Sequence, residues 1–522
     1  MPAKKPPITT TKGIFVVKDG QQLFKTRFSP QSPEVEVPIE ELLEDYQDIG
    51  VEITLAPRAI DPPIYAGLTA NWETQIEQEA EPDYQFCSDE GREKFQDMKF
   101  GLFVHWGLYT HLGTLESWAV NASNAPQWFQ DIYYTLWQMW NPTDFDAEEW
   151  VKVVKRAGMQ FLVLTTKHHE GFCLWDTKTK TKARRRIGHL SDVVVQPVED
   201  CEINFSVMDT PFKRDIIKEL SDAFRKHDLG FGIYFSHIDW NDPNFRWDAA
   251  NRSYDPTYTP ETNPEDWAAF LQRERDQLTE LFTNYGPLNM VFFDGSWNGL
   301  AWAEMKAMIK DLRQLQPNCM LSDRGTGPYG DFTSPERWVP KGTAEEDSKV
   351  TKKVWQVCDC IGTHWSYVPG EVYKPKKDLL HMVIDIVAKG GTLLLDSGPM
   401  PHGLFASEMV DVLEYIGRWL KVNGEAIYST RFHEPYKESD NVFYTRSKDN
   451  QFVYLIHVGW PAPAFQVSSI PPKEGSQIYM LGISDPVPWQ DDGVNLTIEI
   501  PAEFNDKIPC EYAYCFKIEQ QT

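Results

Sequence analysis

The residues that could do chemistry stand at the ends of short apolar stretches. Five stretches end in, or are followed directly by, polar side chains: residues 99–105, 161–169, 231–234, 288–294 and 320–324. Short apolar runs bounded by turn residues are typical of buried parallel strands. In a (β/α)8 barrel the carboxyl ends of the strands surround one active site. The pattern therefore predicts that imidazoles, a phenol, a carboxylate and a guanidinium meet at one mouth.

Two carboxylic acids are the strongest candidates for catalysis. Asp294 ends an apolar strand and precedes Gly295, and Glu336 lies on a loop after the strand that carries Arg324. Hydrolysis of a glycosidic bond needs one carboxyl group to attack or activate water and another to protonate the leaving oxygen. A rigid strand-end aspartate and a loop glutamate suit these two roles. The structural alternatives are an aspartate that caps a βα loop and an ordinary surface glutamate.

The histidines allow a second interpretation, in which the site binds a metal ion. His168 and His169 are adjacent and point to opposite faces while they remain on a strand, although a turn could bring both inward. Together with His105, His237 and Asp294 they could bind a metal ion. However, they lack the i, i+4 spacing of a helical zinc site, and no further pair of ligands accompanies them. We therefore expect no metal and no other cofactor, and histidines that bond to sugar hydroxyls.

A glycine-rich segment at residues 325–330 matches the pattern GxGxxG but does not predict a dinucleotide site. Pro328 interrupts it, no helix follows, and no βαβ unit surrounds it. The glycines would then have no helix N-terminus to offer to a phosphate.

Composition narrows the range of partners. The net charge of −26 argues against nucleic acid and anionic membranes, since both attract clustered Lys and Arg. The one basic run, residues 178–186, is interpreted as a solvated loop. Aromatic residues are abundant, with 19 Trp, 21 Tyr and 29 Phe, and aromatic rings in a cleft can pack on the apolar faces of sugars. The eight cysteines look like buried thiols, not a disulfide framework.

Targeting signals are missing from the sequence. No apolar run approaches the length of a membrane-spanning helix, and no apolar core follows the N-terminal residues to make a signal peptide. We expect a soluble protein, either intracellular or a mature form whose leader was removed. The oligomeric state is left open.

Three regions follow one another along the chain. Residues 1–92 contain short strand patterns near residues 13, 35 and 51, followed by an acidic helix from about residue 76 to 98, and predict a small β-rich extension with a linker. In residues 93–422 strand and helix signals alternate, which predicts a parallel sheet. Residues 423–522 hold strands joined by Asp, Asn, Gly and Pro turns, beginning near residue 426, and predict an antiparallel sandwich.

The predicted fold is thus a (β/α)8 (TIM-like) barrel with a C-terminal antiparallel β-sandwich and a small β-rich N-terminal extension. An open doubly wound sheet is the alternative for the central region. Candidate ligand groups on so many successive strand ends favour closure into a barrel.

Several sequence blocks resemble a known family, the α-L-fucosidases of glycoside hydrolase family 29. The blocks appear in the family's order over roughly residues 95–430: 99–107, 145–150, 164–172, 214–215, 231–236 with Trp240, 291–295, 324–325, 334–336, 364–367, 389–399 and 423–428. One block alone is a weak signal, but their joint order and spacing are specific.

The resemblance implies a retaining mechanism on an imperfect (β/α)8 barrel followed by a β-sandwich. It implies that Asp294 is the nucleophile and that Glu336 stands at the acid/base position. The family's sugar-binding positions fall on a larger set of residues: His105, His168, His169, Tyr234 and Arg324, with Trp106, Trp118, Trp297 and Trp365 as aromatic contacts. The implied partner is a fucosylated oligosaccharide, glycoconjugate or fucan.

The sequence departs from the family at a few positions. The Glu-Trp pair after the first strand is here Glu116-Ser117-Trp118, with the glutamate one position early. A usual Asn is Asp396, and His-Asp-Gly becomes a run with Glu170. Residues 178–207 and the N-terminal region have no counterpart in the resemblance. The first change concerns recognition of a sugar hydroxyl, and so the choice among fucose, related sugars and linkages.

These observations predict an exo-acting retaining α-L-fucosidase that forms a covalent glycosyl-enzyme. Two other classes of function stay open on the residues alone. One is a catalytically silent carbohydrate-binding barrel, which would need no proton donor beside the leaving oxygen. The other is a metal-dependent hydrolase.

Overall fold

The computed structural model describes the backbone of three N-terminal strands, residues 12–18, 21–27 and 52–57. After these strands it describes residues 77, 79–121, 125–186, 198–245, 247–248, 253–254, 258–295, 300–340 and 353–521. No helix among these residues is long and apolar enough to cross a membrane.

Eight parallel strands form the central barrel, and their order in the sheet follows their order in the chain. They are β4 (Phe100–Val104), β5 (Phe161–Lys167), β8 (Gly230–Ser236), β11 (Met290–Asp294), β12 (Met320–Leu321), β13 (Phe332–Thr333), β14 (Val354–Cys360) and β15 (Thr392–Asp396). A parallel bridge between Ser322 and Phe332 joins the two edges of the sheet. The barrel is therefore closed, which confirms the predicted fold over an open sheet.

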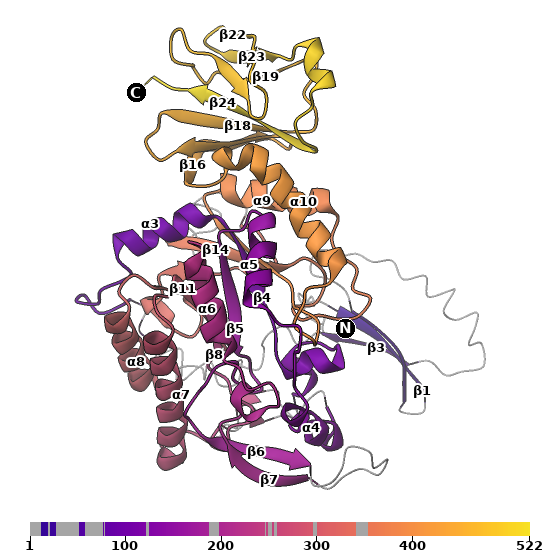
Figure 1. The fold of residues 1–522 in the computed structure, drawn as a ribbon, viewed down its shortest axis with the longest axis vertical. Coiled ribbons are helices and arrows are strands. Elements are labelled where there is room, and N and C mark those ends of the chain that lie inside the picture. Colours follow the sequence, from indigo (N-terminus) through magenta and orange to yellow (C-terminus); the bar gives the residue numbers. More distant parts are fainter. Residues whose placement is uncertain are drawn as a thin grey trace, which may run out of the picture.

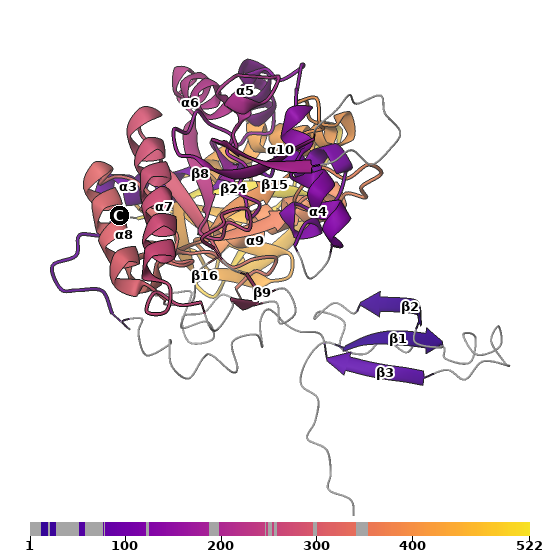
Figure 2. The same cartoon turned by 90° about the horizontal axis from the view of Figure 1, so that it is seen from below.

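Helices surround the strands on the outside (Figures 1 and 2). They are α5 (Ala147–Arg156), α6 (Ile216–Lys226), α7 (Pro264–Asn284), α8 (Trp302–Leu315), α9 (Lys376–Ala388) and α10 (Ser407–Asn423). Helix α5 shows why these segments are helical: Asp146 caps its first turn, and Lys155 and Arg156 lie in its last turn, where cations stabilise the exposed carbonyl groups. Its apolar face, which includes Trp150 and Val154, is buried.

The barrel is irregular after β12. Only a 3-10 turn, Gly327–Tyr329, connects β12 with β13. Strand β13 is two residues long, and the sequence pattern does not predict it. The short connection places the loop that carries Glu336 directly beside β14.

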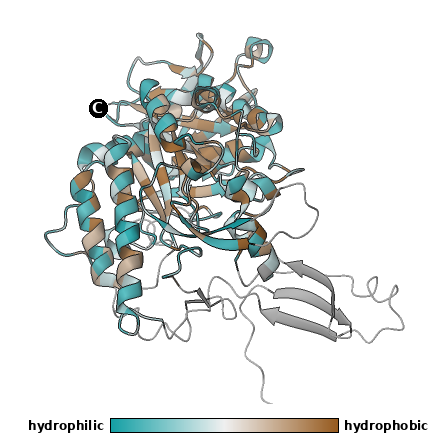
Figure 3. Cartoon of the chain, turned by 60° about the horizontal axis from the view of Figure 1, so that its bottom comes forward, coloured by the Kyte–Doolittle hydropathy of each residue, from teal (hydrophilic) through white to brown (hydrophobic). Residues whose placement is uncertain are grey.

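The hydrophobic core lies among the strands and between the strands and the helices. Strands β4 and β5 are buried along their whole length, as expected for parallel strands covered on both faces. Figure 3 shows hydrophobic residues gathered on the central strands, whereas the surrounding helices mix hydrophobic and hydrophilic residues.

The N-terminal strands form a small antiparallel sheet. Strand β1 (Lys12–Lys18) pairs with both β2 (Gln21–Arg27) and β3 (Glu52–Pro57). The strands predicted near residues 13 and 51 are present, and the one predicted near residue 35 lies outside the described residues. Helix α3 (Asp89–Met98) begins later than predicted, where the Ser88 side chain caps its first turn.

The C-terminal region holds two antiparallel sheets. One contains β16 (Thr430–Ser439), β17 (Val442–Ser447), β18 (Phe452–Val458), β24 (Ala513–Glu519), β20 (Ile478–Met480) and β21 (Pro486–Val487); the other contains β19 (Ala464–Ser468), β23 (Asn495–Glu499) and β22 (Trp489–Asp491). Their inward side chains share one core cluster, which includes Leu455, Leu496 and Phe516. Helix α9 packs against β16 and β17 (Figure 1).

Two local predictions are wrong. Residues 424–426 form a 3-10 turn after α10, not the start of a strand, because the chain continues the helix before it enters β16. The basic run is not a loop: β6 (Thr181–Arg186) pairs with β7 (Val198–Ile203) in an antiparallel hairpin. Thr181 and Ala183 are buried, whereas Lys182 and Arg185 are exposed and Arg184 and Arg186 are partly exposed. All eight cysteines are free thiols.

Candidate active site

Asp294 stands at the carboxyl end of β11 and faces the barrel mouth. Its side chain is 25% exposed. The Tyr234 hydroxyl on β8 donates a hydrogen bond to Asp294 Oδ2 over 2.8 Å, and Arg324 Nη1 donates to Oδ1 over 3.2 Å. Two strands and the segment after β12 thus hold the carboxylate in one orientation.

Arg324 also binds the second carboxylate. Its Nη1 lies 2.9 Å from Glu336 Oε2, while the same nitrogen lies 3.2 Å from Asp294 Oδ1. Because one nitrogen contacts both, Asp294 Oδ1 and Glu336 Oε2 lie no more than about 6 Å apart. The two carboxyl groups are roughly 5–5.5 Å apart in retaining glycosidases and roughly 6.5–9.5 Å apart in inverting ones.

The loop around Glu336 is tied to β14. A parallel bridge joins Glu336 with Cys358, and the amide of Arg337 donates to the Cys358 carbonyl over 2.9 Å. The Glu336 side chain is 43% exposed. The backbone is therefore fixed while the carboxyl group reaches solvent.

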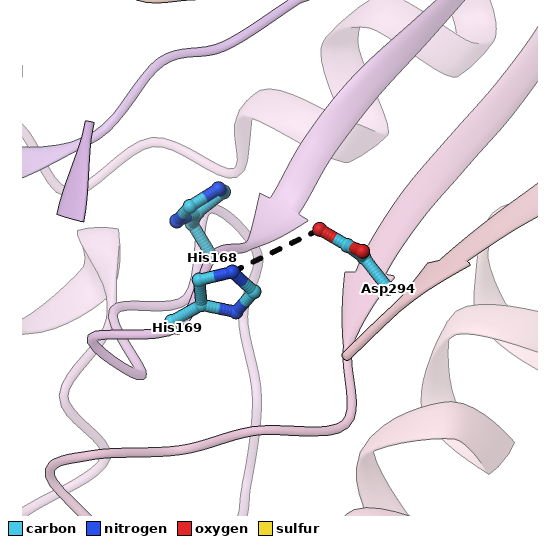
Figure 4. A group of neighbouring side chains, drawn as sticks. All are labelled: His168, His169 and Asp294. Atoms are coloured by element: carbon cyan, nitrogen blue, oxygen red, sulfur yellow. Dashed lines mark ion pairs between the residues drawn. The ribbon is translucent and has the colours of Figure 1, made fainter. Parts of the chain in front are cut away.

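The two adjacent histidines follow β5 and both reach the mouth (Figure 4). The Ser117 hydroxyl hydrogen-bonds to His168 Nδ1. His169 Nδ1 lies 2.7 Å from the Ser236 oxygen, and the Ser236 hydroxyl donates its own proton to the Ile238 carbonyl. His169 Nδ1 must therefore be the donor, which leaves Nε2 of the neutral ring as an acceptor, 3.8 Å from Asp294 Oδ2.

His105 is oriented by a buried carboxyl group. Its Nδ1 lies 2.7 Å from Oδ1 of Asp396, at the end of β15. Burial raises the pKa of the Asp396 carboxyl well above its usual range, and burial lowers the pKa of His105 to about 4. The bond to Asp396 fixes the orientation of the His105 ring. The mouth thus offers two oriented imidazole rings to the hydroxyls of a ligand.

Aromatic rings complete the mouth. Tyr234 stacks on His168 with ring centres 5.4 Å apart, and Trp365 lies 5.3 Å from His105. The Arg337 guanidinium covers Trp365 at 4.7 Å. Trp118 contacts the His169 ring edge at 5.5 Å.

One tryptophan from the predicted set is not brought to this group. Trp106 is 1% exposed and packs in the core against Trp140 and Trp150, because alternation at the end of β4 directs His105 to the mouth and Trp106 away from it. The prediction that Trp106 is an aromatic contact of the site is therefore wrong. Trp297 lies outside the described residues.

The electrostatics keep Asp294 ionised and the histidines neutral. Burial raises the pKa of Asp294, but the Arg324 guanidinium and the hydrogen bond from the Tyr234 hydroxyl outweigh it and hold the pKa below its usual value. Burial lowers the pKa of His169 to about 4 and holds that of His168 well below its usual value. An ionised carboxylate beside neutral imidazoles is suited to nucleophilic attack.

The same residues include the one group of possible metal ligands that we find within the described part of the chain. Ligand atoms of His168, His169 and Asp294 lie within 4.8 Å of one another (Figure 4). However, the Arg324 guanidinium already binds Asp294, and a second cation there would be repelled.

The structure adds residues that the sequence analysis does not place in the site. Ser117 and Ser236 fix the two histidines, and Asp396 fixes His105. Ser236 and Asp396 end their strands, so the signal that identifies Asp294 also applies to them. Ser117 lies on a 3-10 turn far along the connection after β4, and no local pattern marks it.

Comparisons with known proteins agree with this geometry. The family model for α-L-fucosidase matches residues 68–425, and the model for the α-L-fucosidase C-terminal domain matches residues 437–519. The chain is 26% identical to an α-L-fucosidase of Branchiostoma floridae, over 81% of this chain and 92% of the relative. It is also 26% identical to the human plasma α-L-fucosidase, over 81% and 89% respectively.

A solved structure shares the architecture. An α-L-fucosidase from Bacteroides thetaiotaomicron, crystallised as a trapped covalent intermediate with 2-fluoro-fucosyl fluoride in a glutamate-to-glutamine mutant, superposes with a TM-score of 0.69. Its identity to this chain is 25%, and the match covers 85% of this chain and 99% of the neighbour.

A closed parallel barrel with two carboxyl groups at one mouth defines a class of enzyme, the barrel-type glycoside hydrolases. Within that class the match to the family model covers more than half of the chain. The chain belongs to glycoside hydrolase family 29, the α-L-fucosidases.

Proposed function

We propose that this fucosidase is an exo-acting enzyme that releases terminal α-L-fucosyl residues from oligosaccharides, glycoconjugates or fucans with retention of configuration. The observation that carries the proposal is the shared contact of Arg324 with both carboxylates, which limits the distance between Asp294 Oδ1 and Glu336 Oε2. Retaining enzymes need the close spacing, because the nucleophile itself contacts the sugar and no water stands between them.

The residues take complementary roles in this mechanism. Asp294 attacks the anomeric carbon and forms a glycosyl-enzyme, and Glu336 protonates the departing oxygen. Glu336 then deprotonates the water that releases the sugar. His105 hydrogen-bonds to one sugar hydroxyl and His169 Nε2 accepts from another, while His168, Tyr234 and Arg324 contact the sugar ring. Trp118 and Trp365 supply apolar surface, against which the methyl group of fucose can pack.

The variant Asp294→Gly tests the proposal. It should lose nearly all turnover of an aryl α-L-fucoside without unfolding. Added azide should restore part of the activity and yield the β-fucosyl azide, inverted relative to the substrate, because azide enters the space left by the carboxylate. Near-normal turnover by the variant without azide would refute the role of Asp294.

A metal-dependent hydrolase is the second candidate, and it rests on the grouping of His168, His169 and Asp294. Dialysis against a chelator separates the two. The proposed mechanism predicts unchanged hydrolysis of the aryl fucoside after dialysis. Loss of activity that a divalent cation restores would favour the metal-dependent enzyme.

A further inference from the structure

A second cavity lies beside the mouth, under the β6–β7 hairpin. Its volume is about 320 Å³, within the range of small-molecule sites. The hairpin, helix α4 (Gln127–Tyr133) with the residue after it, and the loop after β8 supply its lining, which includes Gln130, Tyr134, Lys182, Arg184, Trp240 and Asn241. The hairpin lies at the end of the barrel that is farther from the sandwich (Figure 1).

One aromatic ring connects this cavity with the reacting carboxylate. Trp240 lines the cavity, and its ring lies 5.2 Å from the ring of His169. His169 Nε2 in turn lies 3.8 Å from Asp294 Oδ2. The backbone supports the same contact, because the Trp240 amide donates to the His169 carbonyl over 2.8 Å. A group that is bonded to a sugar over Asp294 and directed past His169 would meet Trp240.

The hairpin wall is held in place by hydrogen bonds. Trp137 Nε1 donates to the Arg184 carbonyl over 2.8 Å, the Arg186 amide donates to Gln138 Oε1 over 2.7 Å, and Asn241 Nδ2 donates to the Lys182 carbonyl over 2.9 Å. Strand β6 is therefore fixed both to the segment around α4 and to the loop after β8.

The opposite wall is fixed by buried charges. Asp239, next to Trp240, pairs with Arg273 at 2.8 Å and with Lys167 at 3.6 Å, and all three side chains are at most 9% exposed. Because both walls are fixed before binding, little free energy is lost in ordering the side chains of the cavity when a ligand enters.

The lining suits a neutral sugar. Tyr134 and Trp240 offer aromatic surface, and Gln130, Asn241 and Lys182 offer polar groups that can bond to hydroxyls. The positive charge of Arg184 is balanced by its ion pair with Asp131 and by Asp200, which lies opposite it in the hairpin. Lys182 alone does not make the strongly basic site that an anionic sugar would need.

We infer that this cavity binds the first neutral sugar on the leaving-group side of a fucosylated oligosaccharide. The inference rests on the proposed function and extends it: strands β6 and β7, which lie in the stretch 178–207 that the family resemblance leaves unexplained, would select the aglycone. The fucose itself would be bound only by the residues of the mouth.

The experiment compares two substrates. α-L-Fucosyl fluoride has a leaving group of one atom, which cannot occupy the cavity, whereas fucosyllactose places a neutral hexose next to fucose. The wild-type enzyme, Lys182→Ala, Gln130→Ala and the control Arg185→Ala are assayed with both. Arg185 is an exposed arginine of the same strand that does not line the cavity.

Loss of one hydrogen bond to the hexose should lower kcat/KM for fucosyllactose about three- to tenfold in Lys182→Ala and Gln130→Ala. Their kcat/KM for the fluoride should stay near that of Arg185→Ala. Equal ratios of the two activities in all four proteins would overturn the aglycone site. A wild-type enzyme that hydrolyses neither substrate would instead refute the proposed function.

Discussion

Arg324 is the residue on which the arrangement of the two carboxyl groups depends. Its guanidinium contacts both Asp294 and Glu336, and it stands over the Phe292 ring at 5.0 Å, which restricts its movement. A positive charge beside Asp294 keeps that group ionised, as a nucleophile must be. The same charge stands beside Glu336, which delivers a proton in the proposed mechanism. Geometry and exposure support this division of roles: Tyr234 and Arg324 hold Asp294, whereas Glu336 is open to solvent.

The first residue-scale prediction concerns Glu336→Ala. A general acid contributes about 10²–10⁴-fold to the rate, and it matters most when the leaving group is a poor one. We expect kcat/KM for fucosyllactose to fall by that amount, and kcat/KM for a nitrophenyl fucoside to fall much less. Added azide should give the α-fucosyl azide, because an anionic nucleophile needs no general base. Equal losses with both leaving groups would instead indicate a role in binding or folding.

At this scale the sequence predicts residue types better than their partners. Strand-end positions identify Asp294, His105, His168 and Tyr234, because the pattern of apolar runs fixes where each strand ends. Hydrogen-bond partners from distant segments, such as Ser117 for His168, depend on how long connections fold, and local patterns carry no information about them. Trp106 shows that a residue next to a site residue in the sequence need not lie in the site. It follows His105 directly, but the alternation of side chains along the strand directs its ring into the core.

At the scale of elements, the loop after β8 connects the mouth with the cavity, and helix α7 holds it. Arg273 on α7 pairs with Asp239 and Asp242 of this loop at 2.8 and 3.0 Å. The Arg273 side chain is 9% exposed and the two carboxylates less so. Removing one partner of a buried pair leaves an uncompensated charge, which costs more than the pair itself contributes.

We therefore predict that Arg273→Ala lowers the free energy of unfolding by about 3–5 kcal/mol. Arg275→Ala, two residues further along the same helix, is the control: its ion pair with Asp311 is partly exposed and should contribute about 0–1 kcal/mol. Denaturant unfolding of the two variants measures both quantities. Similar values for the two would show that the loop is not held by its charges.

The elements that the sequence predicts well are those with a strong local pattern. Helix α5 has a cap, a charged first turn and an apolar face, all of which can be recognised in its own sequence. Strand β13 has two residues and gives no periodic signal. The β6 strand is misread because its buried residues, Thr181 and Ala183, are small and its basic residues dominate the composition. Such a strand is stabilised by the segments that pack against it, which its own sequence does not reveal.

At the scale of the whole molecule, the barrel and the sandwich follow the predicted order along the chain. Helix α10 ends at Asn423, and strand β16 begins at Thr430. The domain boundaries at residues 92/93 and 422/423 stay predictions. The high net negative charge is not repeated at the mouth, where Arg324 and Arg337 balance the carboxylates.

Buried acidic groups make the stability of the whole molecule depend on pH. Glu170 is 1% exposed, and burial raises its pKa to about 8. Because the folded pKa lies above the unfolded value, the stabilisation is present at low pH and is lost as pH rises from about 4.5 through 8. The folded protein binds one more proton than the unfolded chain in this range.

We predict that Glu170→Gln, which mimics the protonated acid, is about as stable as the wild type at pH 5 and more stable at pH 8, by up to about 4 kcal/mol. The exposed Glu149→Gln is the control and should show no such change. Unfolding in denaturant at the two pH values measures the difference. The same pH dependence in wild type and Glu170→Gln would contradict the assignment.

The central claim, a covalent intermediate on Asp294, can be tested by trapping it. Incubation with 2-fluoro-fucosyl fluoride should inactivate the enzyme, and mass spectrometry of a digest should find one 2-fluorofucosyl group, esterified to Asp294. The Asp294→Gly variant should carry no label. A digest without label from an active enzyme that releases β-L-fucose first would contradict the account, because direct attack by water would then replace the carboxylate.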